Sequence, residues 1–203
     1  NRMIDPAEFC TALESHDFGF FTGVPDSLLK DLLAYITTTY PADKHVIAAN
    51  EGSAVALASG HYLATGKPAA VYMQNSGIGN AVNPLLSLAD ELVYSIPMLL
   101  VIGWRGEPGK KKDEPQHLKQ GKVTLGLLEA MGIEYEVLDP ELGDFESSVA
   151  RIVSKMNDSS SPVALVVSAG TFSEFKLSAR SETTFEMSRE DAIERIVQQL
   201  SSD

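Results

Sequence analysis

The sequence has little of several features that would mark other classes of protein. Its one cysteine, Cys10, excludes an internal disulfide and favours a reducing compartment, so we expect a cytoplasmic protein. No apolar run approaches the about 18 residues of a membrane span, and the first residues do not read as a signal peptide, so no membrane partner is expected. Positive charge is also scarce. The 16 basic residues stand against 28 acidic ones, and this net charge of −12 argues against nucleic-acid binding.

What is present indicates a globular α/β domain. Hydrophobic residues make up 44% of the 203 residues, enough for one well-packed core. Apolar runs predict strands over residues 18–23, 45–49, 69–73, 97–103, 135–138 and 163–168. Helical patterns between them predict helices over 6–15, 26–38, 52–65, 79–90, 122–131 and 145–157. Because several strands are apolar at consecutive positions, we expect a doubly wound, mainly parallel six-stranded sheet flanked by helices.

Two segments depart from this alternation. Residues 103–122 form a polar stretch that we expect to be a loop, longer than a simple connection requires. From residue 178 the chain is polar, and a helical pattern then follows in which Ser188 and Asp191 have the spacing of a capping box. We therefore expect one domain over residues 1–177, followed over 178–203 by a linker and the start of a helix.

The candidate site lies where the predicted strands end. In an open parallel sheet, ligands bind beyond the carboxyl ends of the strands. The segments that follow the strands are 22–27, 50–53, 74–80, 104–117 and 168–172, and all but the last are rich in polar, glycine and titratable residues.

Glu51 is the most informative of these residues, because it stands alone between a strand and an alanine-rich helix. One interpretation is that it complements the helix dipole, an effect of about 0.3–1 kcal/mol. The other follows from its flanks, Ala48, Ala49, Ala54 and Val55, which surround the carboxylate with apolar groups. A carboxyl group in such a setting can exchange a proton with a bound heterocycle.

The segment after the third strand is built for close approach of a ligand. Gly77 and Gly79 lack side chains, and the amides of Asn75, Asn80 and Asn83 offer directional hydrogen bonds. A dinucleotide site would need G-x-G-x-x-G on the first strand–helix turn. This segment has only G-x-G and follows the third strand, so a nucleotide-binding dehydrogenase domain is disfavoured.

The segment 103–122 runs against the acidic average of the chain. Its six basic residues, set against three acidic ones, are Arg105, Lys110, Lys111, Lys112, Lys119 and Lys122. Such a segment would attract a small anion, although solvated lysines are an equal alternative. His117 suits proton transfer or anion contact. We expect the other histidines, which lack a partner pattern, to be structural or exposed: His16, His45 and His61.

Taken in order, these segments resemble a known family. They include "GVPDSLLKDLL", "ANEGSAVALASGHYLATGK", "QNSGIGNAVNPLLSLAD", "GWRGEPG", "DEPQH" and "GTFS". The likeness, over residues 4–176, is to the N-terminal half of the phosphonopyruvate decarboxylases. These are thiamine-diphosphate (ThDP) enzymes and close kin of the sulfopyruvate decarboxylases. The half in question is their pyrimidine-binding (PYR) domain.

The resemblance implies roles for individual residues. Glu51 would hydrogen-bond N1′ of the ThDP aminopyrimidine and activate the cofactor, with His117 as a second catalytic residue. The cofactor pocket would be lined by Glu51, Asn75, Ser76, Gly77, Gly79 and Asn80. The anionic 2-oxo acid substrate would be contacted by Asp26, Ser27, Arg105, Gln116 and His117. The implied reaction converts 3-phosphonopyruvate to phosphonoacetaldehyde and CO₂.

One departure from the family is clear. Its second domain, called PP, carries a G-D-G…N segment that holds Mg²⁺ and the diphosphate, and no such segment occurs here. We therefore expect no metal ligand in this chain. The PP domain would belong to the same or a neighbouring subunit of a homo-oligomer, and the chain alone would be inactive. The alternatives are the α subunit of a sulfopyruvate decarboxylase and a non-catalytic domain that kept the fold.

Overall fold

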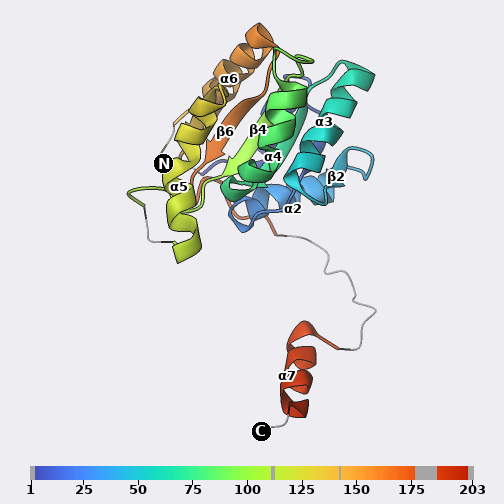
Figure 1. Ribbon diagram of the computed structural model, residues 1–203, viewed down its shortest axis with the longest axis vertical. Coiled ribbons are helices and arrows are strands. Elements are labelled where there is room, and N and C mark those ends of the chain that lie inside the picture. Colours follow the sequence, from blue (N-terminus) through green and yellow to red (C-terminus); the bar gives the residue numbers. More distant parts are fainter. Residues whose placement is uncertain (1–2, 111–112, 142, 177–186, 201–203) are drawn as a thin grey trace.

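The computed structural model describes residues 3–110, 113–141, 143–176 and 187–200. Its centre is one six-stranded parallel sheet in the order β2-β1-β3-β4-β6-β5. Figure 1 shows β4 and β6 of this sheet behind the helices α4 and α5. The strands are β1 (Phe21–Gly23), β2 (His45–Ile47), β3 (Ala69–Gln74), β4 (Met98–Gly103), β5 (Tyr135–Leu138) and β6 (Val163–Val167). The predicted doubly wound parallel sheet is thereby confirmed.

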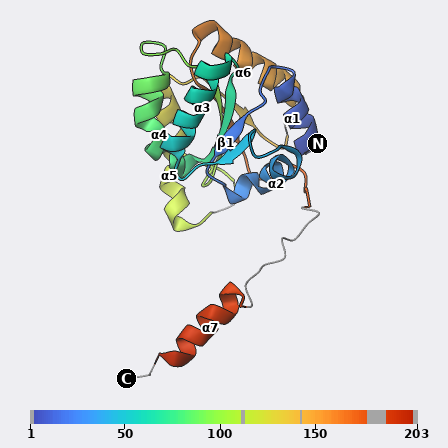
Figure 2. The ribbon, with the colours of Figure 1, turned by 90° about the vertical axis from the view of Figure 1, so that its right-hand side faces the viewer.

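Helices cover both faces of the sheet (Figure 2). One face packs against α1 (Pro6–Glu14), α2 (Lys30–Thr39) and α6 (Phe145–Ser159). The other packs against α3 (Glu51–Thr65), α4 (Ile78–Pro84) and α5 (Pro115–Ala130). Short turns complete the chain: η1 (Ser27–Leu29), η2 (Asn75–Gly77) and the π turn η3 (Leu85–Ala89).

The core lies along the central strands. Every residue of β4 and β6 is buried, as expected for consecutive apolar positions in a strand covered on both faces. Each fully buried aliphatic side chain contributes about 1.5–3 kcal/mol of transfer free energy. Cys10 belongs to this core on α1, and burial raises the pKa of its thiol to about 12, so it is not a nucleophile.

The first two strands are shorter than predicted. Their ends are set by hydrogen-bonded pairing with the neighbouring strands and not by the length of the apolar run. β1 starts only at Phe21, where it meets His45 of β2 and Ala70 of β3. β2 ends at Ile47, because the chain then turns toward Asn50. The side chain of Asn50 caps α3 by accepting the N–H of Ser53 at 2.9 Å.

The expected loop over 103–122 is wrong in its second half. Helix α5 begins at Pro115, not near residue 122, with proline in the first turn where its missing N–H costs nothing. The longer helix packs on the preceding segment through the indole N–H of Trp104, which donates to the carbonyl of Gly121 at 2.9 Å. Polarity misled the prediction, since Gln and Lys are good helix formers on an exposed face.

The helix expected near the C-terminus is α7 (Arg189–Gln199), and the predicted capping box of Ser188 and Asp191 opens it. It lies apart from the sheet (Figures 1 and 2), and none of its residues is buried. Residues 177–186, which include the start of the predicted linker at residue 178, lie outside the described residues, so the division after residue 177 stays a prediction. None of the described helices combines the length and apolarity needed to cross a bilayer.

Candidate functional site

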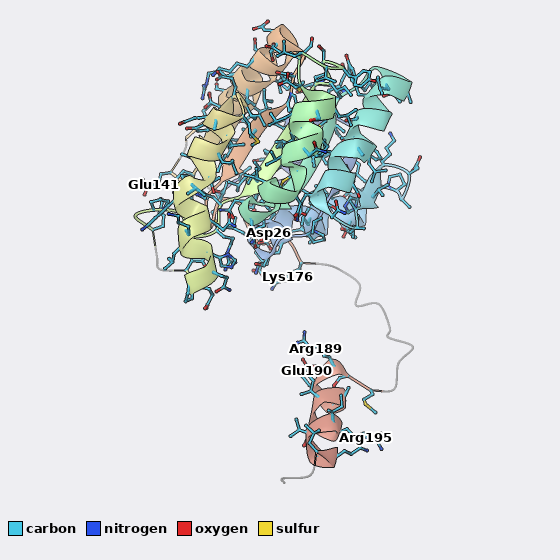
Figure 3. The ribbon with its side chains drawn as sticks, viewed as in Figure 1. Asp26, Glu141, Lys176, Arg189, Glu190 and Arg195 are labelled. Carbon is cyan, nitrogen blue, oxygen red and sulfur yellow. The ribbon has the colours of Figure 1, made fainter. Side chains whose placement is uncertain are left out.

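The candidate residues gather at one edge of the sheet. They follow the carboxyl ends of four strands that are adjacent in the sheet, in the order β2, β1, β3 and β4. Asp26, in the turn between β1 and α2, marks this edge in Figure 3. Parallel strands bring their carboxyl ends together, so segments far apart in the sequence meet here.

Glu51 opens helix α3 and is 9% exposed. Its Oε2 accepts a hydrogen bond of 2.8 Å from Nδ2 of Asn80 on α4. Gly77 lies directly against the carboxylate, and a Cβ at that position would overlap the Glu51 side chain. No donor in the described part of the chain reaches Oε1 of Glu51. The carboxylate is thus fixed on one side and has an acceptor oxygen left for a ligand.

We expected the side-chain amide of Asn75 to face a ligand, but in the structure it forms its hydrogen bonds inside the domain. It is 2% exposed, and its Nδ2 donates to the carbonyl of Arg105 and to Oγ1 of Thr124, both at 2.9 Å. Its Oδ1 accepts the N–H of Arg105 at 3.2 Å. The side chain is therefore used inside the domain, where it ties the end of β3 to the segment after β4.

Asp26 is a buried carboxyl group, 5% exposed, whose two oxygens make no well-formed hydrogen bond within the described residues. It fits against Gly103, where a Cβ would overlap its Oδ2. Burial raises the pKa of Asp26, and the nearby N–H groups and the charges of Arg105 and His117 only partly oppose this rise. An unpaired buried carboxyl is costly, which makes it a functional candidate.

Arg105 connects the first and fourth strand ends. Its Nε and Nη2 bind the carboxylate of Asp113 at 2.9 and 2.8 Å, a bidentate pair, and its Nη1 donates to Oγ of Ser27 at 3.1 Å. The same carboxylate accepts the N–H of Gly106 at 2.9 Å. The segment after β4 is thereby held over the turn that carries Ser27.

The Arg105–Asp113 pair predicts a pH dependence. Arg105 lowers the pKa of Asp113 to about 2, so the carboxylate stabilises the folded chain above its unfolded pKa of about 3.9. That contribution should be lost as the pH falls from about 4 through 2. Carboxyl ¹³C titration should give Asp113 a midpoint near 2, and Arg105→Gln should raise it. A midpoint near 4 in the unsubstituted chain would contradict the pairing.

The positive charge of segment 103–122 is less available than the sequence suggested. Arg105 is paired with Asp113, and Lys110 binds Asp139 at 2.8 Å. Lys119 and Lys122 are exposed along α5, whereas Lys111 and Lys112 lie outside the described residues. His117 and Gln116 stand in the first turn of α5. His117 is half-buried, and its charge slightly opposes the burial-driven rise in the pKa of Asp26. The structure gives no contact between His117 and Glu51.

Sequence reasoning missed His45. Its Nε2 lies 2.8 Å from the hydroxyl of Tyr72 on β3, and both residues line a hollow beside Asp26. His61 instead stacks on Phe20 with ring centroids 4.6 Å apart. The sequence signal that could have revealed this pair is Gly23. It lies on β1, between the strands of His45 and Tyr72, and its lack of a side chain leaves room for the Tyr72 ring to pass over β1.

Comparison with known proteins gives the family of the chain. A family model described as "Thiamine pyrophosphate enzyme, N-terminal TPP binding domain" matches residues 8–123. A phosphonopyruvate decarboxylase of Streptomyces viridochromogenes is 34% identical over 148 residues, 73% of this chain and 36% of that protein. A sulfopyruvate decarboxylase subunit alpha of Methanocaldococcus jannaschii is 36% identical over 162 residues, 78% of this chain and 89% of that subunit.

Solved structures support the fold. The benzoylformate decarboxylase of Polynucleobacter necessarius superposes with a TM-score of 0.58 at 20% identity, over 98% of this chain and 36% of that one. The chain likewise spans only 36% of the length of the phosphonopyruvate decarboxylases that it matches. The match of the family model to more than half of the sequence, together with this fold, shows that the chain belongs to the thiamine pyrophosphate enzymes through their N-terminal TPP-binding domain.

Proposed function

We propose that this chain is the pyrimidine-binding half of a ThDP-dependent 2-oxo acid decarboxylase that converts 3-phosphonopyruvate to phosphonoacetaldehyde and CO₂. The observation that carries the proposal is the Glu51 carboxylate, buried at the ligand-binding edge of the sheet and held by Asn80. A carboxylate that merely complemented a helix dipole would gain nothing from such burial.

The residues around Glu51 fit an aminopyrimidine. The acceptor oxygen left on Glu51 would bind a protonated ring nitrogen, and the glycine beside it gives the ring and the carboxylate room. Ser76, Gly77, Gly79 and Asn80 follow on one short turn and the start of α4. Asn75 supports this turn from inside the domain rather than touching the ligand.

ThDP, when bound, supplies the carbon nucleophile and the electron sink that decarboxylation needs. Glu51 would hold and move the proton at N1′ of its pyrimidine ring. The burial of Glu51 would keep water away from this exchange and would hold the carboxylate in one orientation for it. Asn80 keeps the carboxylate in place.

The substrate would approach from the side of Asp26. Asp26, Ser27 and His117 are the groups that we assign to the 2-oxo acid, with Arg105 and Gln116 as anion contacts. Two observations support the assignment: Arg105 donates to Ser27, and His117 lies near Asp26. His117 would act as the second catalytic residue by proton transfer.

The active enzyme would also need a site for Mg²⁺ and the diphosphate of ThDP. Within the described residues, no cluster of three or more His, Cys, Asp or Glu side chains could hold a metal ion. We infer that Mg²⁺ and the diphosphate bind to a PP domain of the same or a neighbouring subunit, in a cytoplasmic homo-oligomer. The alternative is the alpha subunit of a sulfopyruvate decarboxylase, because the chain is about as similar to such a subunit, at 36% identity, as to a phosphonopyruvate decarboxylase, at 34%.

The test is CO₂ release by the full-length protein with ThDP and Mg²⁺, with phosphonopyruvate and sulfopyruvate assayed in parallel. This 203-residue chain alone serves as the control and should be inactive. Preference for phosphonopyruvate is the expected result. Preference for sulfopyruvate, or activity only with a second polypeptide, would move the assignment to the alternative. Inactivity on both substrates would overturn the proposal.

A further inference from the structure

A small hollow lies beside Asp26, between α2 and the β2 edge of the sheet. It encloses about 340 Å³, which is the size of a site for a small ligand. Leu33, Ala34 and Ile47 form its apolar wall. Its polar lining consists of Asp26, Ser27, Lys30, Thr37, His45 and Tyr72. Through Asp26 and Ser27 this hollow adjoins the substrate side of the proposed site.

A hydrogen-bonded pair crosses the sheet at this hollow. Tyr72 lies on β3 and His45 on β2, and between them Gly23 of β1 stands beside the Tyr72 ring. A Cβ on Gly23 would overlap Tyr72, so the glycine permits the 2.8 Å contact between the hydroxyl and Nε2 of His45. Burial lowers the pKa of His45 and so favours the neutral ring. A neutral imidazole carries one N–H and the tyrosine one O–H. The bond between them uses one of these two protons, so the other remains as a donor for a ligand.

The hydrogen-bond donors of the hollow, rather than its net charge, favour an anion, because Lys30 is its one cation and Asp26 its one acid. Lys30 forms no ion pair within the described part of the chain, and Ser27 and Thr37 add hydroxyl groups. Asp26 is the one acid of the lining, and it is buried with both oxygens unpaired. The donors therefore exceed the acceptors, an arrangement suited to an oxyanion with several oxygens.

The neighbouring hollow is less suited to an anion. It encloses about 500 Å³ and is also lined by Ser27 and Lys30. Its other cations each form an ion pair, Arg105 with Asp113 and Lys110 with Asp139, so an anion at Arg105 would lie beside a carboxylate and add only a secondary contact. It further contains Asp31 and Glu107. Acidic groups thus balance the basic ones there.

We propose that Lys30, His45 and Tyr72 form a recognition site for a tetrahedral oxyanion, the phosphonate or sulfonate end of the substrate. This inference rests on the proposed function, which supplies the substrate. It adds residues to Asp26, Ser27 and Arg105, which were assigned to the substrate above. The 2-oxo acid end would lie toward Asp26, and the second anion would enter the hollow between Lys30 and the His45–Tyr72 pair. A 2-oxo acid that lacks the second anion would leave these donors unused.

The test is ¹⁵N NMR of the four imidazole rings of this chain, titrated with methylphosphonate, methanesulfonate and acetate. The two tetrahedral anions should shift the His45 signals, while the His61 signals serve as an internal reference. Lys30→Met and Tyr72→Phe should each weaken binding by about tenfold. Lys67→Met, a control at the exposed Asp17 pair, should leave it unchanged.

Three outcomes would overturn the proposal: no shift of His45, an equal shift with acetate, or a shift confined to His117. The last would place the anion at α5. Because the measurement needs neither ThDP nor turnover, it can fail while the proposed decarboxylation stands. A shift by methylphosphonate but not methanesulfonate, or the reverse, would support the site and tell which oxyanion it takes.

Discussion

Replacing Glu51 by Gln is expected to reduce decarboxylation by the full-length enzyme by about 10²-fold or more, since proton exchange by a positioned acid contributes about that much. The change is nearly isosteric, and Asn80 can still donate to the remaining oxygen, so the fold should be kept. The measurement is kcat for CO₂ release at saturating ThDP and substrate, together with thermal unfolding of the same variant.

A matched control is available in the chain. Glu146 also stands in the first turn of a helix, α6, but is exposed, and Glu146→Gln should leave kcat unchanged. Equal rates for Glu51→Gln and the unsubstituted enzyme would show that Glu51 only complements the dipole of α3. A loss of rate with a matching loss of stability would point to folding rather than to chemistry.

The second large effect is expected at Gly77. Gly77→Ala places a Cβ where the Glu51 side chain lies, so the carboxylate must move or the turn η2 must shift. Overpacking of this kind costs about 1–3 kcal/mol of folding free energy. Displacing the carboxylate should also lower activity toward that of Glu51→Gln. Denaturant unfolding and CO₂ release measure the two effects.

Gly60→Ala provides the comparison for Gly77. Gly60 lies within α3 with no atom near its would-be Cβ, so alanine there should stabilise the helix by about 0.5–1 kcal/mol and leave the rate unchanged. If Gly77→Ala behaved like Gly60→Ala in both assays, the close packing of Glu51 on Gly77 would have no part in the function.

The pattern of apolar residues was sufficient for much of the fold. Continuous burial of β4 and β6 follows from runs such as Met98–Gly103, because a strand covered on both faces needs apolar side chains at consecutive positions. The position of Glu51 could also be predicted, because the junction between a strand and the helix that follows it lies at the carboxyl edge of a parallel sheet. These features depend on local sequence and on rules that hold for the whole fold class.

Other features were decided only by contacts between distant segments. The start of α5 at Pro115 depends on packing against the segment after β4, which a polar stretch does not reveal. Asn75 turned inward because Arg105 and Thr124 saturate its amide.

The same holds for the partners of the ionisable side chains. The charge of segment 103–122 was partly neutralised by Asp139, which lies on a different loop. His45 gained its partner from Tyr72, two strands away in the sheet. Sequence alone thus determined the sheet and its helical layers, because hydrophobic periodicity encodes burial, and it indicated the edge where the candidate residues gather. The tertiary structure decided which polar groups are bound within the domain and which are left without a partner, because each hydrogen bond depends on where a remote partner lies.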